Sequence, residues 1–263
     1  MNYWDRQYNP RVAVADPERY FASWRTRAAL ARSNHAGHVE LRYGAHERER
    51  LDVFRSPAAR GTLVFLHGGY WRAFGKEDFS WIAVPFVQAG ISVVVASYPL
   101  CPHASLATIS RSIGAALGYL GAEVLLPGER RRLVLAGHSA GAHLAAQNLA
   151  QPGVHAFVGI SGIYDLQPLL HAPFLSAMGW DAAELHAMSP LYASAPGACR
   201  IVLAVGGAES HEFHRQSQRL AEAWAPPCEG VLTVPGMNHF DVLESLCDSG
   251  SALSDRTLGL FDP

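Results

Sequence analysis

The sequence has few cysteines, no long apolar run and almost no charge imbalance. Its four cysteines nowhere form a Cys-x-x-Cys spacing, which argues against a disulfide framework and against a cysteine-ligated zinc site. No apolar run reaches the ~20 residues that a transmembrane helix requires, and residues 1–6 lack the apolar core of a signal peptide. A formal net charge of −2 gives no electrostatic reason to expect a nucleic acid or a membrane as partner. We therefore expect a cytoplasmic chain with reduced thiols.

Apolar residues make up 49% of the 263 residues and charged residues 17%, which is typical of a globular chain with a substantial core. No repeat or linker divides the sequence, so we expect a single domain over residues 1–263. Several short runs are almost continuously apolar, as parallel strands covered on both faces must be. These predicted strands are residues 61–66, 91–96, 133–136, 156–160, 201–205 and 231–234.

Helical patterns lie between these strands, which predicts a mostly parallel sheet with helices on both faces. The predicted helices are residues 78–88, 106–120, 142–149, 212–224 and 240–246. Residues 1–35 form an N-terminal extension with a helix beginning near Asp16, and strands at 38–43 and 49–54 read as an edge hairpin. Residues 166–198 lack a clear strand. We expect them to form a helical cap excursion over the carboxyl ends of the strands, where such sheets bind ligands.

The most informative segment is Gly-His-Ser-Ala-Gly at residues 137–141, between a strand pattern and an alanine-rich helix pattern. Gly-x-Ser-x-Gly in this setting predicts a nucleophile elbow, a sharp turn that presents the hydroxyl of Ser139. Side chains at Gly137 and Gly141 would keep the strand and the helix apart. The alternative is a glycine-rich turn with an incidental serine, and the choice depends on whether Ser139 has partners.

A serine nucleophile requires a base, and the base requires an orienting acid. After an elbow of this kind the acid and the histidine follow in that order, each behind a later strand. Of the 13 histidines, His239 alone follows the final core strand in a glycine-bearing loop, and we predict that it is the base. Glu209 follows the strand at 201–205, and we predict that it is the acid.

Three other carboxylates compete with Glu209 for the acid position. Asp165 lies one strand too early, and Glu212 opens a predicted helix, where a carboxylate favours the helix dipole. Asp241 is too close to His239 in sequence to reach its ring from across a loop. Glu209 is therefore the preferred candidate.

A glycine loop, His-Gly-Gly-Tyr-Trp at residues 67–71, follows the strand at 61–66. Backbone N–H groups of Gly68 and Gly69, together with that of Ala140, are predicted to donate to the oxyanion of an acyl-transfer reaction. Tyr70 and Trp71 are candidates to wall an aryl-binding pocket. Packing of the loop against the core is an equally open alternative for both aromatic residues.

These motifs resemble the α/β-hydrolase superfamily. Within it, the chain is similar to the arylformamidase (kynurenine formamidase) branch, near the hormone-sensitive-lipase-like esterases. Four segments carry this similarity: the glycine loop in its His-Gly-Gly-Tyr-Trp form, residues 209–217, Asn-His-Phe-Asp at 238–241 and Gln-Tyr-Asn-Pro-Arg at 7–11. The resemblance implies an α/β-hydrolase fold and a triad of Ser139, Glu209 and His239, with no metal and no organic cofactor. Glu209 departs from the better-known arylformamidases, which carry aspartate at this position.

The resemblance implies a small-molecule amidase that acts on aryl formamides such as N-formylkynurenine. The main alternative is a carboxylesterase of short-acyl or aryl esters, which uses the same machinery with a different pocket. A binding protein that has lost catalysis is a third reading, but all three triad positions are filled. The aromatic N-terminal segment, with Tyr3, Trp4 and Tyr8, could cover the site or form the contact of a homodimer.

Overall fold

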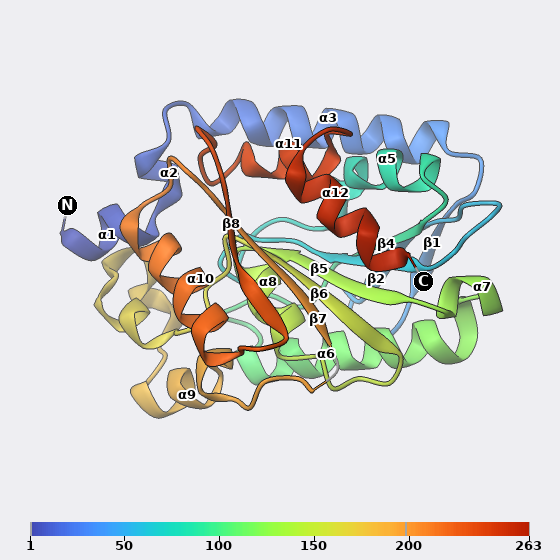
Figure 1. The fold of residues 1–263 in the computed structure, drawn as a ribbon. Coiled ribbons are helices and arrows are strands. Elements are labelled where there is room, and N and C mark those ends of the chain that lie inside the picture. The colour runs from blue at the N-terminus through green and yellow to red at the C-terminus, as the bar shows by residue number, and fades with distance from the viewer. Residues whose placement is uncertain (1, 198, 263) are drawn as a thin grey trace.

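The computed structural model describes residues 2–197 and 199–262, which fold around one β-sheet (Figure 1). Its strands run in the order β1-β2-β4-β3-β5-β6-β7-β8. The pairs β1–β2 and β2–β4 are antiparallel, and every other neighbouring pair is parallel. The strands are β1 (His38–Arg42), β2 (Arg50–Phe54), β3 (Thr62–Leu66), β4 (Ser92–Ala96), β5 (Leu133–His138), β6 (Val154–Ile160), β7 (Arg200–Gly206) and β8 (Cys228–Val234). The predicted parallel core is confirmed.

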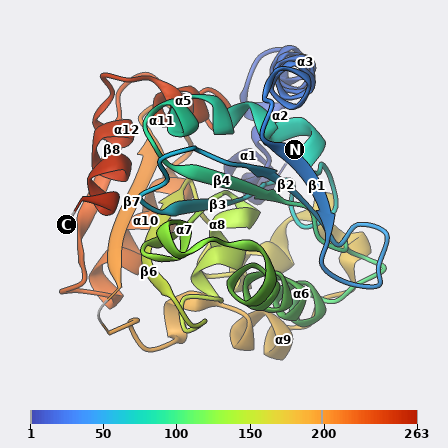
Figure 2. The same ribbon diagram turned by 90° about the vertical axis from the view of Figure 1, so that its right-hand side faces the viewer.

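Helices cover both faces of the sheet, as Figures 1 and 2 show from two directions. One face is covered by α3 (Pro17–Asn34), α5 (Ala83–Gln88), α11 (Val242–Cys247) and α12 (Ala252–Leu258). The other is covered by α6 (Leu106–Tyr119), α8 (Ala140–Ala146) and α10 (His211–Ala223). The remaining helical segments are α1 (Tyr3–Tyr8), α2 (Pro10–Ala13), α4 (Lys76–Phe79), η1 (Ser80–Ile82), η2 (Leu120–Val124), α7 (Pro127–Arg130), η3 (Gln167–His171), η4 (Pro173–Met178), α9 (Ala182–Ala187), η5 (Pro190–Tyr192) and η6 (Gly259–Phe261).

The core consists of two hydrophobic clusters, one on each face of the sheet. Side chains alternate between faces along a strand, so Val64 and Leu66 of β3 join one cluster and Leu63 and Phe65 join the other. Every residue of β3, β4 and β5 is buried. This double burial explains why these segments read as continuous apolar runs rather than as alternating ones.

The helix predicted at 78–88 is wrong as a single element. The chain there forms α4, then the 3₁₀ turn η1, then α5. Pro85 has no N–H to donate to the carbonyl of Trp81, so one continuous helix would lose a hydrogen bond at that position. Phe79 already leaves helical geometry, with φ −123° and ψ 0°.

The predicted edge hairpin is confirmed, because β1 and β2 pair antiparallel at one edge of the sheet. β1 lies at the edge, whereas β2 pairs on both sides, and Asp52 is completely buried. The Asp52 carboxylate accepts hydrogen bonds from Ser80 Oγ at 2.6 Å and His38 Nε2 at 2.9 Å, and Lys76 Nζ lies 3.1 Å away. Asp52 of β2 therefore belongs to a buried ionic cluster that joins the strand to α4.

The described part of the excursion, residues 166–197, contains η3, η4, α9 and η5, and Ala198 lies outside the described residues. The N-terminal helix α1 lies beside it. Trp4 stacks on His171 with ring centroids 5.5 Å apart, and Asn2 Nδ2 donates to the His171 carbonyl at 3.2 Å. Two segments far apart in the sequence therefore pack together at the same end of the molecule.

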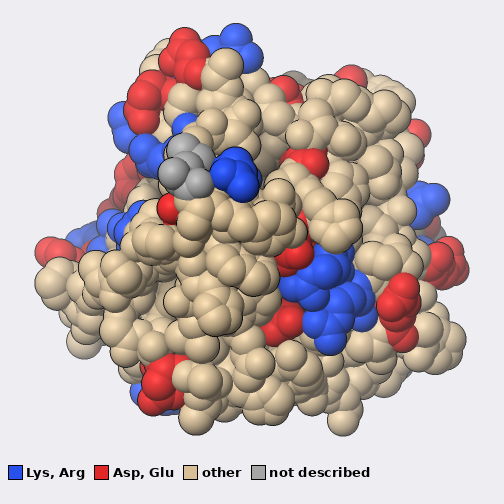
Figure 3. All heavy atoms as spheres, turned by 90° about the vertical axis from the view of Figure 1, so that its left-hand side faces the viewer, with Lys and Arg blue, Asp and Glu red and all other residues tan. Residues whose placement is uncertain are grey.

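All four cysteines carry free thiols. Within the described residues, no helix combines the length and the apolarity that crossing a membrane would require. On the face shown in Figure 3, basic and acidic side chains are interspersed, and the most prominent basic area is bordered by acidic groups. That face offers no broad surface of one charge.

Candidate active site

Ser139 occupies the sharp turn between β5 and α8. Its backbone has φ 55° and ψ −119°, a strained conformation for a residue with a side chain. A Cβ at Gly137 would lie 2.3 Å from the carbonyl oxygen of Gly141, and one at Gly141 would lie 2.0 Å from that of Leu66. Both glycines are therefore required for the strand and the helix to approach, as the sequence predicts.

His239 and Glu209 form a buried pair at the ends of the last two strands. His239 Nδ1 lies 2.6 Å from Glu209 Oε2, and the Glu209 side chain has no exposed surface. The other carboxylate oxygen accepts hydrogen bonds from Ser161 Oγ at 2.5 Å and from the Gly206 N–H at 2.7 Å. Because a carboxylate accepts, Nδ1 carries the imidazole proton, and Nε2 is left as the basic nitrogen. Ser139 and His239 line the same cavity.

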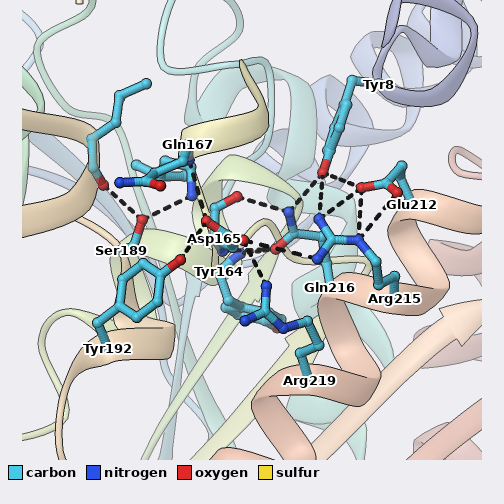
Figure 4. A network of polar contacts seen from close by, with 12 residues as sticks. Tyr8, Tyr164, Asp165, Gln167, Ser189, Tyr192, Glu212, Arg215, Gln216 and Arg219 are labelled. Carbon is cyan, nitrogen blue, oxygen red and sulfur yellow. Dashed lines mark hydrogen bonds and ion pairs between the residues drawn. The ribbon is translucent and has the colours of Figure 1, made fainter. Parts of the chain in front are cut away.

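The three competing carboxylates are engaged elsewhere. Asp165 accepts a hydrogen bond from Arg219 Nη1 at 2.8 Å, and Glu212 accepts one from Tyr8 Oη at 2.7 Å, both within the network of Figure 4. Asp241 accepts a hydrogen bond of 2.5 Å from a backbone N–H three residues earlier. Of the four candidates, the structure brings Glu209 to His239.

Two further histidines flank the site as neutral groups. His138 Nε2 donates to the backbone carbonyl of His239 at 2.8 Å, and burial lowers the pKa of His138 well below its ordinary value. Burial lowers the pKa of His67 to about 3. The His67 ring stacks on Tyr98 with centroids 4.2 Å apart, and Tyr98 donates to the His67 carbonyl at 2.6 Å. Both imidazoles therefore shape the backbone around the site without adding positive charge.

The glycine loop lies directly against Ser139. A Cβ at Gly68 would be 3.2 Å from the Cβ of Ser139, and Gly69 has φ +108°. Tyr70 and Trp71 continue the loop with φ 52° and 55°. Ala140 is the first residue of α8, so its N–H has no carbonyl one turn earlier in the helix to accept it.

The two aromatic residues of the glycine loop have different environments. Tyr70 lines the cavity, and its hydroxyl donates to the backbone carbonyl of Tyr8. Trp71 is completely buried, and its indole donates to His143 Nδ1 at 3.2 Å. Because Trp71 is not among the residues that line the cavity, loop packing describes its position better than an aryl wall does.

The cavity at Ser139 and His239 has a volume of ≈ 270 Å³ and a mainly aromatic wall. Much of this wall escapes sequence reasoning, because it comes from elements far from the motifs. Two motifs supply part of this wall: Gln-Tyr-Asn-Pro-Arg at residues 7–11 contributes Asn9, Pro10 and Arg11, and Asn-His-Phe-Asp at 238–241 contributes Phe240. The wall residues from outside the motifs are Phe21, Trp24, Arg72, Ala73, Phe74, Phe79 and Phe174.

Among residues 2–197 and 199–262, no group of three or more His, Cys, Asp or Glu side chains gathers where it could hold a metal ion.

Comparison with known proteins agrees with this fold. A family model described as alpha/beta hydrolase fold matches residues 63–188. A kynurenine formamidase from Salmo salar is 31% identical over 244 residues, covering 85% of this chain and 81% of the relative. This chain belongs to the α/β-hydrolase family. A kynurenine formamidase from Danio rerio is 28% identical over 99% of this chain and 94% of its own.

The similarity to one solved structure covers the whole of this chain. The crystal structure of a candidate thioesterase from Silicibacter sp. TM1040 superposes with a TM-score of 0.89 at 30% identity, covering 100% of both chains. The similarity to this hydrolase therefore includes the N-terminal extension and the excursion as well as the sheet.

Proposed function

We propose that this α/β-hydrolase cleaves small aryl formamides such as N-formylkynurenine through an acyl-enzyme on Ser139. The observation that carries the proposal is the buried Glu209–His239 pair at 2.6 Å, with His239 and the strained Ser139 on one cavity wall. This combination supplies a nucleophile, a base and an orienting acid.

In the acylation step, Ser139 Oγ attacks the formyl carbon while His239 Nε2 takes the hydroxyl proton. Glu209 holds the imidazole through Nδ1 and stabilises the imidazolium that forms. Negative charge develops on the formyl oxygen, and the N–H groups of Gly68, Gly69 and Ala140 donate to it. The C–N bond then breaks, and His239 returns the proton to the departing aryl amine.

In the deacylation step, water attacks the formyl ester on Ser139, and His239 takes one of its protons. Collapse of the second tetrahedral intermediate breaks the ester bond, and His239 gives the proton back to Ser139 Oγ. Formic acid leaves and ionises in water to formate and a proton, and the free enzyme is restored. Each step balances with water as the sole co-reactant.

The aryl formamide assignment is supported by the cavity and by the relatives. Aromatic side chains that include Tyr70, Phe74 and Phe174 form the wall, which suits a planar aryl group. Two of the relatives are named kynurenine formamidases. Formyl is the smallest acyl group, so an enzyme for formamides needs little space beyond the reacting carbonyl.

The test is a ladder of acyl groups, measured as kcat/KM. N-formylkynurenine is compared with N-acetylkynurenine, and phenyl acetate with phenyl butyrate. We expect the formamide to be the best substrate and the added methyl group of the acetamide to lower kcat/KM by about 100-fold, because a site that fits a formyl group would have to move aside for the extra methyl group. Negligible turnover of the formamide beside rapid cleavage of both esters would instead assign the carboxylesterase activity.

We also propose a cytoplasmic location, which the free thiols support. We propose a single domain in which residues 166–198 form a cap, and the position of Phe174 in the cavity wall supports this cap. Finally, we propose a homodimer, which light scattering across a concentration series tests.

A further inference from the structure

We propose that Arg72, assisted by Arg11, forms an anion-binding subsite at the rim of the cavity, so that the enzyme selects aryl substrates that carry a carboxylate. This inference rests on the proposed hydrolytic function and adds the charge of the substrate to it. The observation behind it is the distribution of charge around the cavity, which differs between its base and its rim.

The cavity wall carries two guanidinium groups and no carboxylate among the described residues that line it. Ser139 is 2% exposed and His239 4%, so the reacting groups lie at the base. Arg11 and Arg72 are exposed, so their charges lie at the solvent end. A ligand that fills the cavity therefore meets catalytic groups at one end, aromatic rings along its length and positive charge at the other end.

Arg72 has free donor capacity. Its Nη1 donates to the backbone carbonyl of Phe174 at 3.0 Å, and its guanidinium lies 5.7 Å from the centroid of the Phe174 ring. Within the part of the chain that the structure describes, no carboxylate lies in ion-pair range of Arg72. A guanidinium has five N–H donors, so most of them are left for a ligand, and the ring and the carbonyl restrict its position.

Arg11, in helix α2, contributes a second guanidinium to the rim of the same cavity. Its guanidinium lies 4.6 Å from the Phe21 centroid and 5.8 Å from that of Phe74, and both rings line the cavity. Nη1 of Arg11 also forms an exposed ion pair of 3.2 Å with Glu18. The pair offsets one positive charge, so the rim retains about one uncompensated positive charge, which suits a single carboxylate group.

A carboxylate is the planar monoanion that a guanidinium binds with two parallel hydrogen bonds. The ligand class is thus an aryl amide or aryl ester that also carries a carboxylate apart from the reacting acyl group. Recognition at the rim would act on substrate binding, whereas the chemistry at the base would depend on the triad.

The experiment uses two substrate pairs that differ in this charge, at low ionic strength. One pair is N-formylkynurenine and its methyl ester, and the other is 4-acetoxybenzoate and methyl 4-acetoxybenzoate. The enzymes are wild type, Arg72→Gln, Arg72→Lys and Arg11→Gln. Arg111→Gln is the matched control, since Arg111 is exposed on α6 and does not line the cavity. Circular dichroism verifies that each variant is folded.

We expect wild type and Arg111→Gln to prefer the carboxylate member of a pair by about tenfold in kcat/KM. Arg72→Gln should abolish this preference through KM, Arg11→Gln should reduce it, and Arg72→Lys should retain part of it. Salt at about 0.5 M should weaken the preference in wild type. Equal losses on both members of a pair in Arg72→Gln, or a wild type without preference, would overturn the proposal.

The two substrate pairs separate this inference from the proposed function. An Arg72-dependent preference within the ester pair, with neither formamide cleaved, would support the subsite and reject the formamidase assignment. Cleavage of both formamides at equal rates would support the assignment and reject the subsite.

Discussion

The carboxylate of Glu209 has three hydrogen-bond partners although the side chain is completely buried, and these partners come from three different parts of the chain. His239 follows β8, Ser161 follows β6, and the N–H of Gly206 ends β7. A buried carboxylate is costly unless its oxygens accept hydrogen bonds, so these donors account for its burial. At the scale of single residues, the site thus depends on groups that sequence patterns do not mark, and Ser161 is the clearest of them.

Replacing Glu209 tests its role as the acid. Glu209→Gln should lower kcat by about 10³-fold, because a neutral amide cannot stabilise the His239 imidazolium and does not select the tautomer that leaves Nε2 basic. Steady-state kinetics measures the effect, with Asp165→Asn and Asp241→Asn as the rival carboxylates. A larger loss in either rival variant than in Glu209→Gln would reject the assignment.

Ser161 should act on rate rather than on binding, since it contacts Glu209 and does not line the cavity. Ser161→Ala removes one hydrogen bond to the carboxylate, and we expect kcat to fall about fivefold, corresponding to ~1 kcal/mol, with KM unchanged. Separate determination of kcat and KM checks this. An effect confined to KM would place Ser161 in substrate binding instead.

At the scale of elements, the elbow depends on the contact between β3, β5 and α8. Both elbow glycines meet backbone atoms rather than side chains, and backbone atoms in a central strand cannot move aside cheaply. The glycine loop is then placed over the elbow with several residues in the left-handed region. The strain in these turns is sustained by the rigid strands that precede them.

Two glycine substitutions should have opposite effects. Gly141→Ala places a Cβ 2.0 Å from the carbonyl oxygen of Leu66, so we expect a loss of more than about 3 kcal/mol in unfolding free energy. The matched control is Gly118→Ala in helix α6, where no atom lies within 4 Å of the added Cβ. That change should stabilise the protein by about 0.5–1 kcal/mol. Urea denaturation measures both, and equal stability of the two variants would reject the steric account.

Much of the sheet could be predicted from the sequence because its strands are buried on both faces. Runs such as β3 and β4 are almost entirely apolar, and the order of motifs along the chain predicts that Ser139, Glu209 and His239 follow three different strands, which are β5, β7 and β8. The break at Pro85 was missed because a helical apolar pattern continued across it. The burial of Asp52 could not be predicted, because its partners come from other elements. Alternation of polar and apolar residues along a strand is the same whether the polar side chains face solvent or a buried ionic cluster.

At the scale of the whole molecule, the N-terminal extension completes the site. Tyr8 Oη donates to Glu212 at 2.7 Å and accepts from Gln216 Nε2 at 2.8 Å, while the Tyr8 carbonyl accepts from Tyr70 (Figure 4 shows the first two contacts). Tyr8 and Glu212 are 204 positions apart in the sequence. No local pattern records such a contact, so the motif at residues 7–11 alone does not show how the N-terminal segment is anchored beside the site.

Stability should decrease on acidification, because several buried histidines are held neutral. Burial lowers the pKa of His143 to about 4 and that of His67 to about 3, both below the ordinary value of 6.5. Below pH ~6.5 the unfolded chain therefore binds protons that the folded chain does not. The free energy of unfolding should fall from pH 6.5 toward pH 4, by up to about 1.4 kcal/mol per pH unit for each such histidine.

Urea denaturation at a series of pH values measures this slope. His143→Gln should reduce it by about one histidine's share, because the neutral imidazole of His143 accepts from Trp71 and donates to the Met188 carbonyl. His103→Gln, at an exposed position, is the control and should keep the wild-type slope. A slope that is the same in wild type and His143→Gln would contradict the explanation.

The most direct test of the account is kcat/KM for N-formylkynurenine in wild type and in Ser139→Ala, with circular dichroism to verify that both are folded. If Ser139 is the nucleophile, the variant should lose about 10⁴-fold or more, because the acyl-enzyme cannot form. Retention of more than about 1% of wild-type kcat/KM in a folded Ser139→Ala variant would contradict the proposed mechanism.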